Sequence, residues 1–128
     1  MASHIHNFSF NSANPYALAE FWSKITERPI HEGDKPGDPE VAIDLGNGTN
    51  LFFQLDPNPK PEADRNRLHV CLRPDDRTRD EEVDRVLTFG ATLFDDRRNP
   101  DGTGWAVMRD PEGNEFCLER SEAERASS

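Results

Sequence analysis

The same order of predicted elements occurs twice along this chain of 128 residues. A short run rich in aromatic and branched side chains, at 5–10 and again at 68–73, predicts a strand in each half. Each run precedes a segment with helical periodicity, and three strand-like segments separated by turns follow in each half. His6 and His69, which lie 63 residues apart, occupy equivalent places in the two halves. This repetition predicts an α+β fold made of two tandem β-α-β-β-β modules with eight strands.

Both predicted helices have their own start signals. Asn14 followed by Pro15 is typical of an N-cap with proline at the first helical position. Thr78 and Glu81 form a capping box for the second helix, which Gly90 is expected to end. The apolar stripe of the first helix has helical spacing and consists of Leu18, Phe21, Trp22 and Ile25. Local sequence therefore places one amphipathic helix after the first strand of each module.

We expect the whole chain, 1–128, to be a single domain, because its length is close to the commonest domain size. The modules would span about 3–55 and 67–120, with the proline-rich segment 56–66 as the linker and 121–128 as a polar tail that frays. Two such modules predict a curved, incompletely closed mixed sheet with the helices outside. A concave sheet face of this kind suits a small molecule.

Charge and cysteine content exclude several classes of function. The net charge of −10 repels phosphate backbones, so we expect no nucleic-acid partner. No apolar run approaches the roughly 20 residues of a membrane-spanning helix, and the start of the chain lacks the basic and apolar regions of a secretory signal. Two cysteines do not make a disulfide framework. The expected location is therefore the cytoplasm, with no membrane partner.

The predicted core is thin, since Leu, Ile, Val and Phe together make up only about a fifth of the chain. Eight phenylalanines and two tryptophans compensate in part, because each buries a large apolar area. Open sheets also leave edges for a partner to complete. We therefore expect a symmetric homodimer, including one in which modules are exchanged through the linker.

Five segments in a fixed order point to a known family. The chain resembles the vicinal oxygen chelate (VOC) superfamily, which contains glyoxalase I, extradiol dioxygenases, fosfomycin-resistance proteins and bleomycin-resistance proteins. Within it, the chain is similar to the branch described as the glyoxalase-like domain. The resemblance covers about residues 3–120. It rests on 17–22, 51–54, 66–70, 89–92 and 110–116.

The resemblance implies a metal ligand on the first and last strand of each module. His6 matches the histidine of the first module and His69 that of the second. The last ligand is normally a glutamate, and here Cys117 stands in its place. The carboxylate of the first module would fall near Phe52 or Gln54, and neither is acidic. The usual set of two histidines and two glutamates is therefore broken at both acidic positions, and we expect no stoichiometric metal.

Two residues leave an alternative open. Glu119 could complete a set of two histidines and one carboxylate, whereas Cys117 beside His6 and His69 would suit zinc. The expected function is binding of a small organic molecule in the cavity, as a drug- or metabolite-binding protein or a metal-independent enzyme. The alternative is a lyase, isomerase or extradiol-type dioxygenase that uses one of these sets with Zn, Ni, Mn or Fe. The sequence names neither a substrate nor a catalytic residue.

Strand alternation predicts which side chains face the cavity. His69, Cys71 and Arg73 share one face of their strand, and the apolar face with Leu68 should lie beneath a helix. His69 or Arg73 could also lower the pKa of a neighbouring thiol. The predicted lining of the cavity is His6, Phe8, Phe52, Gln54, His69, Cys71, Arg73, Trp105, Cys117 and Glu119. His6, Gln54, His69 and Cys117 are expected to converge.

Overall fold

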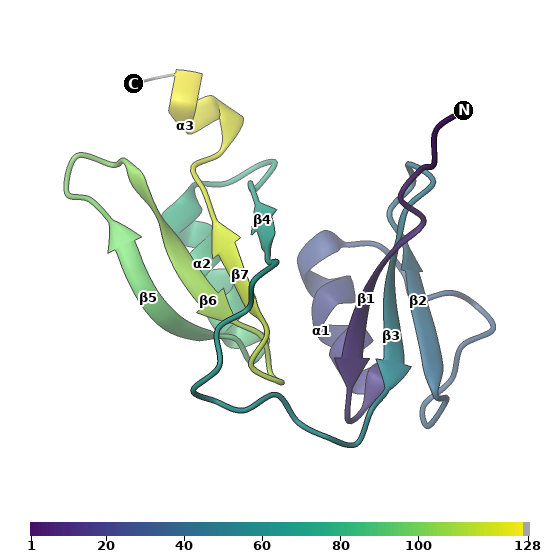
Figure 1. Ribbon diagram of the computed structural model, residues 1–128. Coiled ribbons are helices and arrows are strands. Elements are labelled where there is room, and N and C mark those ends of the chain that lie inside the picture. The colour runs from purple at the N-terminus through teal and green to yellow at the C-terminus, as the bar shows by residue number, and fades with distance from the viewer. Residues whose placement is uncertain (127–128) are drawn as a thin grey trace. The chain divides into compact units, whose positions relative to one another are not determined.

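The structure is a computed structural model that describes residues 1–126, so the last two residues of the predicted tail lie outside it (Figure 1). The chain forms two compact units, Met1–Pro59 and a second beginning at Lys60. This boundary falls within the segment predicted as the linker. Each unit contains one open sheet, and neither sheet closes into a barrel. The α+β class predicted from the sequence is confirmed.

The first unit consists of β1 (Asn7–Ser12), α1 (Pro15–Thr26), β2 (Glu40–Asp44) and β3 (Asn50–Leu55). Its strand order is β1-β3-β2, with β1 parallel and β2 antiparallel to β3. Asn14 caps α1 as predicted, because its side chain accepts a hydrogen bond from the backbone N–H of Ala17.

The strand predicted around Ile30 is reduced to a single bridge between Ile30 and Ile43 of β2. The chain leaves the sheet directly after this bridge. The carboxylate of Asp34 then accepts the hydrogen bond from the N–H of Ala42, at 2.9 Å, that a longer strand would have taken. The described residues therefore contain seven strands, and the prediction of eight was wrong.

The second unit repeats this topology with one more strand. It consists of the elements β4 (Val70–Leu72), α2 (Arg79–Thr88), β5 (Thr92–Arg98), β6 (Gly104–Arg109), β7 (Glu115–Leu118) and α3 (Glu122–Ala126). The strand order is β4-β7-β6-β5, and again the first strand is parallel to the last. In both units a helix therefore connects the first strand to a meander that returns beside it.

The start of the predicted tail is ordered as α3, so fraying was the wrong expectation for 121–126. The hydroxyl of Ser121 accepts from the N–H of Glu124, and the carboxylate of Glu124 accepts from the N–H groups of Ser121 and Arg79. A polar cap thus joins α3 to the first turn of α2.

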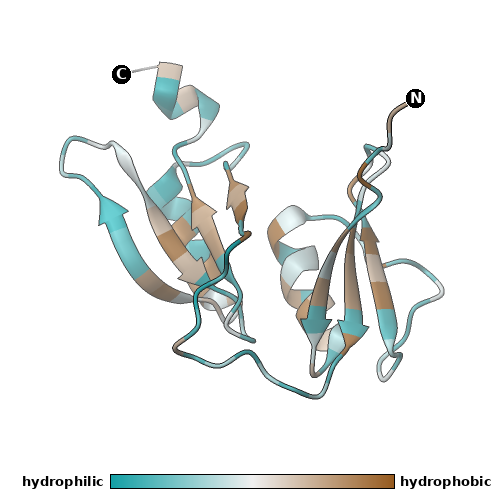
Figure 2. Ribbon diagram, in the orientation of Figure 1, coloured by the Kyte–Doolittle hydropathy of each residue, from teal (hydrophilic) through white to brown (hydrophobic). Residues whose placement is uncertain are grey.

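The core of the first unit is aromatic and lies between its sheet and α1 (Figure 2). Phe53 and Trp22 are fully buried there, and the Phe10 ring lies 5.0 Å from that of Phe53 and 5.4 Å from that of Trp22. In the second unit, the hairpin between β5 and β6 depends on Gly104, which has a φ of +88°. A Cβ there would lie 2.1 Å from the carbonyl oxygen of Arg97, so only glycine permits this pairing.

No helix among residues 1–126 is long and apolar enough to cross a membrane.

Candidate functional site

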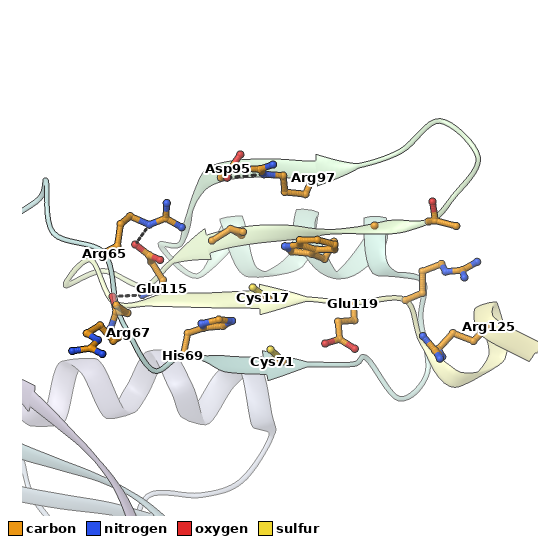
Figure 3. A pocket seen from close by; sticks show the side chains of 16 residues that line it. Arg65, Arg67, His69, Cys71, Asp95, Arg97, Glu115, Cys117, Glu119 and Arg125 are labelled. Carbon is orange, nitrogen blue, oxygen red and sulfur yellow. Dashed lines mark hydrogen bonds and ion pairs between the residues drawn. The ribbon is translucent and has the colours of Figure 1, made fainter.

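The second sheet has one face covered by α2 and one open face (Figure 3). Residues paired in register project to the same face. On the covered face Phe116, Leu118 and Met108 are completely buried. On the open face one row crosses all four strands through Cys71, Cys117, Val107 and Asp95. Leu68, predicted for the covered face, instead precedes β4 and is 76% exposed.

The open face contains a cavity of about 780 Å³ whose lining residues all come from the second unit. Five residues of the predicted set line it, namely His69, Cys71, Trp105, Cys117 and Glu119. Arg73 lies outside this lining, contrary to the prediction. Its Nε donates to Glu119 at 3.0 Å and its Nη1 donates to Glu122 at 2.6 Å, so ion pairs with the segment after β7 hold it away.

The first unit does not place its predicted residues on one face. Phe8 is paired with the buried Leu51, so it belongs to the face that α1 covers and not to the open face. Phe8 is still 38% exposed because β1 is an edge strand. Phe52 and Gln54 alternate with the buried positions and lie on the open face, where Gln54 donates to Asn11. The prediction that Phe8 faces the cavity was therefore wrong.

His6 lies before β1 and is exposed. The first open-face position of the strand belongs to Asn7, whose side chain accepts a hydrogen bond from Asn50 at 3.2 Å. The predicted convergence of His6 and Gln54 with residues of the second unit stays a prediction.

The lining of the cavity is locally basic although the chain is acidic. It contains five arginines and three carboxylates. Arg65 is paired with Glu115 at 2.7 Å and Arg97 with Asp95 at 2.8 Å. Burial acts to raise the pKa of Glu115, but hydrogen bonds from the guanidinium groups of Arg65 and Arg109 outweigh it and lower the pKa.

Two of the five arginines are available to a ligand. Within residues 1–126, the side chains of Arg67 and Arg120 make no hydrogen bond or ion pair. Sequence reasoning passed over both, because acidic residues are interleaved with arginines throughout the second half of the chain. The position of Arg67 directly before the strand of His69 was the one signal that could have found it.

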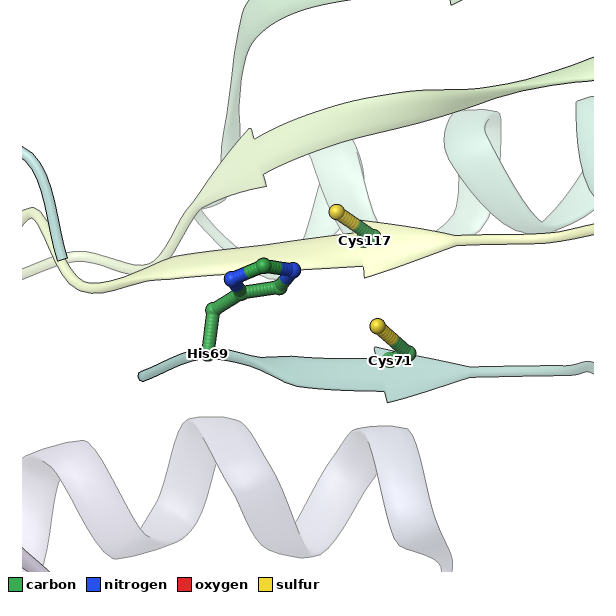
Figure 4. A group of neighbouring side chains, drawn as sticks. All are labelled: His69, Cys71 and Cys117. Atoms are coloured by element: carbon green, nitrogen blue, oxygen red, sulfur yellow. The ribbon is translucent and has the colours of Figure 1, made fainter. Parts of the chain in front are cut away.

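Three metal-binding side chains converge on the open face. One donor atom each of His69, Cys71 and Cys117 lies within 4.8 Å of the other two, and all three side chains project to the same side of β4 and β7 (Figure 4). Burial raises the pKa of Cys117 to about 11, and the neighbouring Cys71 and Glu119 contribute. Burial and Glu119 also raise the pKa of Cys71. Both thiols are therefore protonated at neutral pH, so neither is an activated nucleophile.

Comparison with known proteins supplies the family. The sequence profile of the glyoxalase-like domain matches residues 7–119. No curated protein sequence matches the chain. Solved structures with the same fold have low sequence identity to this chain.

One neighbour is a fosfomycin resistance protein, FosX, from Listeria monocytogenes, which was solved with Mn(II) and 1S,2S-dihydroxypropylphosphonic acid. Its sequence is 15% identical to this chain, and the two structures match with a TM-score of 0.71 over 98% of this chain and 95% of that one. A second neighbour is a glyoxalase/bleomycin resistance protein/dioxygenase family enzyme from Burkholderia phytofirmans PsJN. It is 17% identical, with a TM-score of 0.64 over 91% of this chain and 97% of that one. A third neighbour is TnmS3, an antibiotic binding protein from Streptomyces sp. CB03234. It is 24% identical, with a TM-score of 0.60 over 92% of this chain and 95% of that one.

The residues present do not fit the two-histidine, two-carboxylate metal centre that the resemblance implies. Cys117 stands at the last-strand position, and Asn7 holds the open-face position at the start of β1. Neither Phe52 nor Gln54 supplies a carboxylate on β3. The profile match covers residues 7–119 and the repeated strand order of the two units agrees with it, so the chain belongs to the glyoxalase-like domain family.

Proposed function

We propose that this protein binds a planar organic molecule with a negatively charged group on the open face of its second sheet. The observation that carries this proposal is the side chain of Trp105, which lines the cavity and is 46% exposed. Small-molecule sites are concave and are lined by aromatic side chains with a few polar groups, as this cavity is. A flat ligand would stack on the indole ring.

The charge of the cavity indicates the second property of the ligand. Arg67 and Arg120 are free to form charge-assisted hydrogen bonds with a carboxylate, sulfonate or phosphonate. Two structural neighbours support a binding role, since TnmS3 is an antibiotic binding protein and the FosX structure holds a phosphonic acid. In this proposal the geometry of the cavity selects the ligand, and no two-carboxylate metal centre takes part.

The test uses a panel of planar aromatic acids paired with their neutral amides, in buffer containing a metal chelator. We expect acids to bind more tightly than their amides. Trp105→Ala should weaken binding of both about tenfold, because stacking contributes roughly 1–1.5 kcal/mol. Arg67→Gln and Arg120→Gln should weaken only the acids. Isothermal titration calorimetry measures all three effects, and Lys35→Gln in the first unit is the charge-matched control.

Two results would contradict the proposal. One is equal binding of acids and amides by the native protein. The other is an affinity that Trp105→Ala leaves unchanged while circular dichroism shows a native fold.

We also propose a homodimer in a reducing compartment such as the cytoplasm. Two open sheets leave four edge strands, whose unpaired backbone groups a second copy of the chain can complete. The chain has only two cysteines, too few for the disulfide framework of a small secreted domain. Multi-angle light scattering of the reduced protein at micromolar concentration should give twice the mass of one chain. A mass equal to one chain at that concentration would contradict the dimer.

A further inference from the structure

The thiols of Cys71 and Cys117 form a pair that the organic ligand does not require. The two residues are partners in the parallel register of β4 and β7. Cys71 is exposed, and Cys117 is buried at the base of the cavity. His69, two residues before Cys71, adds an imidazole on the same face. Backbone hydrogen bonding between β4 and β7 therefore holds the two cysteines, and His69 directly precedes β4.

The spacing of these donors matches the needs of a tetrahedral ion. Bonds of about 2.3 Å to sulfur and 2.1 Å to nitrogen place the ligand atoms of a tetrahedral Zn²⁺ roughly 3.5–3.8 Å apart. The three donor atoms already lie within 4.8 Å of one another without an ion. A shift of about 1 Å, within reach of small side-chain rotations, completes the geometry.

We propose that His69, Cys71 and Cys117 bind Zn²⁺ or another thiophilic divalent cation, with the fourth coordination position open to the cavity. This inference goes beyond the proposed function and needs no organic ligand. It also differs from the centre with two histidines and two carboxylates. All three donors come from one sheet, and Cys71 has no counterpart among the ligand positions that the family resemblance implies.

The chemistry of the donors selects the metal. Thiolates favour Zn²⁺ and its softer relatives over Mn²⁺ and Mg²⁺, which prefer oxygen. Binding replaces two S–H bonds with two metal–sulfur bonds and releases two protons, while the imidazole binds in its neutral form. The two thiolate charges then balance the charge of the cation. Because the cation displaces the protons of both thiols, the affinity should rise with pH.

The open position is the reason that such an ion would matter to function. Zinc sites with three protein ligands keep the fourth position for water or substrate. His69, Cys71 and Cys117 all line the same cavity as Trp105. A cation there would present an exchangeable position to a ligand stacked on the indole ring.

The test uses the full-length chain without an affinity tag, reduced and stripped of metal. Titration of Zn²⁺ against a chromophoric chelator should give one ion per chain with a Kd below about 1 µM. Co²⁺ should give the near-ultraviolet charge-transfer band of a thiolate complex. Calorimetry in buffers of different ionisation enthalpy should report two protons released per ion. A thiol assay should label the exposed Cys71 in the free protein and find it protected by Zn²⁺.

Amino-acid substitutions distinguish this site from a centre that also uses His6. Loss of a hydrogen-bonding group around a metal ligand already costs 10–100-fold in affinity, so loss of a ligand should cost at least about 100-fold. We expect that effect from Cys71→Ser, whose side chain is exposed and whose replacement should not disturb folding, and from His69→Asn. The matched control is His6→Asn, which should leave the affinity for Zn²⁺ unchanged.

Each contrary outcome overturns the proposal. These are a Kd for Zn²⁺ weaker than about 10 µM in the reduced protein, Mn²⁺ bound more tightly than Zn²⁺, or an affinity that Cys71→Ser leaves intact. Weakening by His6→Asn equal to that by His69→Asn would indicate a centre shared by the two modules instead. The ligand assay of the proposed function runs with chelator present, so failure of one proposal is distinguishable from failure of the other.

Discussion

Replacing Phe53 with alanine is expected to lower the free energy of unfolding by about 3–5 kcal/mol. Phe53 is completely buried in β3, and its ring stacks on that of Phe10, which also contacts Trp22. Truncation removes the transfer free energy of the ring and leaves a cavity that the sheet and α1 cannot close by small shifts. Because a protein of this size has a total stability of roughly 5–15 kcal/mol, the loss is a large part of the whole.

Phe52 supplies the matched control for this substitution. It is the preceding residue of the same strand, so the change in side chain and in strand propensity is identical, but it projects from the opposite, open face. Phe52→Ala should cost no more than about 1 kcal/mol, since a half-buried ring loses much less contact. Urea denaturation followed by circular dichroism measures both variants. Equal losses from the two would contradict the assignment of faces in the first unit.

Replacing Arg79 with methionine should lower the free energy of unfolding by about 3 kcal/mol. The side chain of Arg79 is almost completely buried, and its Nη1 donates to the carbonyl oxygens of Gly102, Thr103 and Gly104 at 3.0–3.1 Å. Methionine keeps most of the apolar stem but leaves these acceptors without their donor, and each unsatisfied group costs about 1–3 kcal/mol unless water reaches it.

The comparison for this variant is Arg97→Met. Arg97 is mostly exposed and pairs with Asp95 on the sheet surface, so its loss should cost no more than about 1 kcal/mol. Thermal and urea unfolding of both variants give the two values. Because Thr103 and Gly104 also line the cavity, Arg79→Met should weaken ligand binding as well. A stability equal to that of the native protein would show that water replaces the guanidinium.

Much of the fold is encoded locally and could be predicted. The cap at Asn14, the capping box of Thr78 and Glu81, and Gly90 with its φ of +111° act within a few residues, and the two helices begin and end near the predicted positions. The repeat at 63 residues likewise indicated two units with one topology. Strand ends were less predictable, because the strand around Ile30 is limited by the side chain of Asp34, which accepts a hydrogen bond from the N–H of Ala42, eight residues further along the chain.

The open faces show how a small shift changes the site. The sequence predicts the first strand at 5–10, whereas β1 spans Asn7–Ser12. Side chains alternate along a strand, so the choice between His6 and Asn7 as the first open-face residue depends on a register that only pairing with β3 defines. The prediction that Leu68 lies on the covered face was wrong for a similar reason, because β4 begins two residues after it.

The sequence by itself determined the repeat, the helices with their caps, the family resemblance and the absence of two acidic ligands, because each of these depends on neighbouring residues or on residue identity alone. The tertiary structure alone decided that Cys71 lies opposite Cys117. These residues are on parallel strands joined by a long connection, and their partnership depends on hydrogen bonding between strands far apart in the chain. It also decided that arginines outnumber carboxylates around Trp105 in an acidic protein, because the fold brings residues from distant parts of the second unit, such as Arg65 and Arg120, to one cavity.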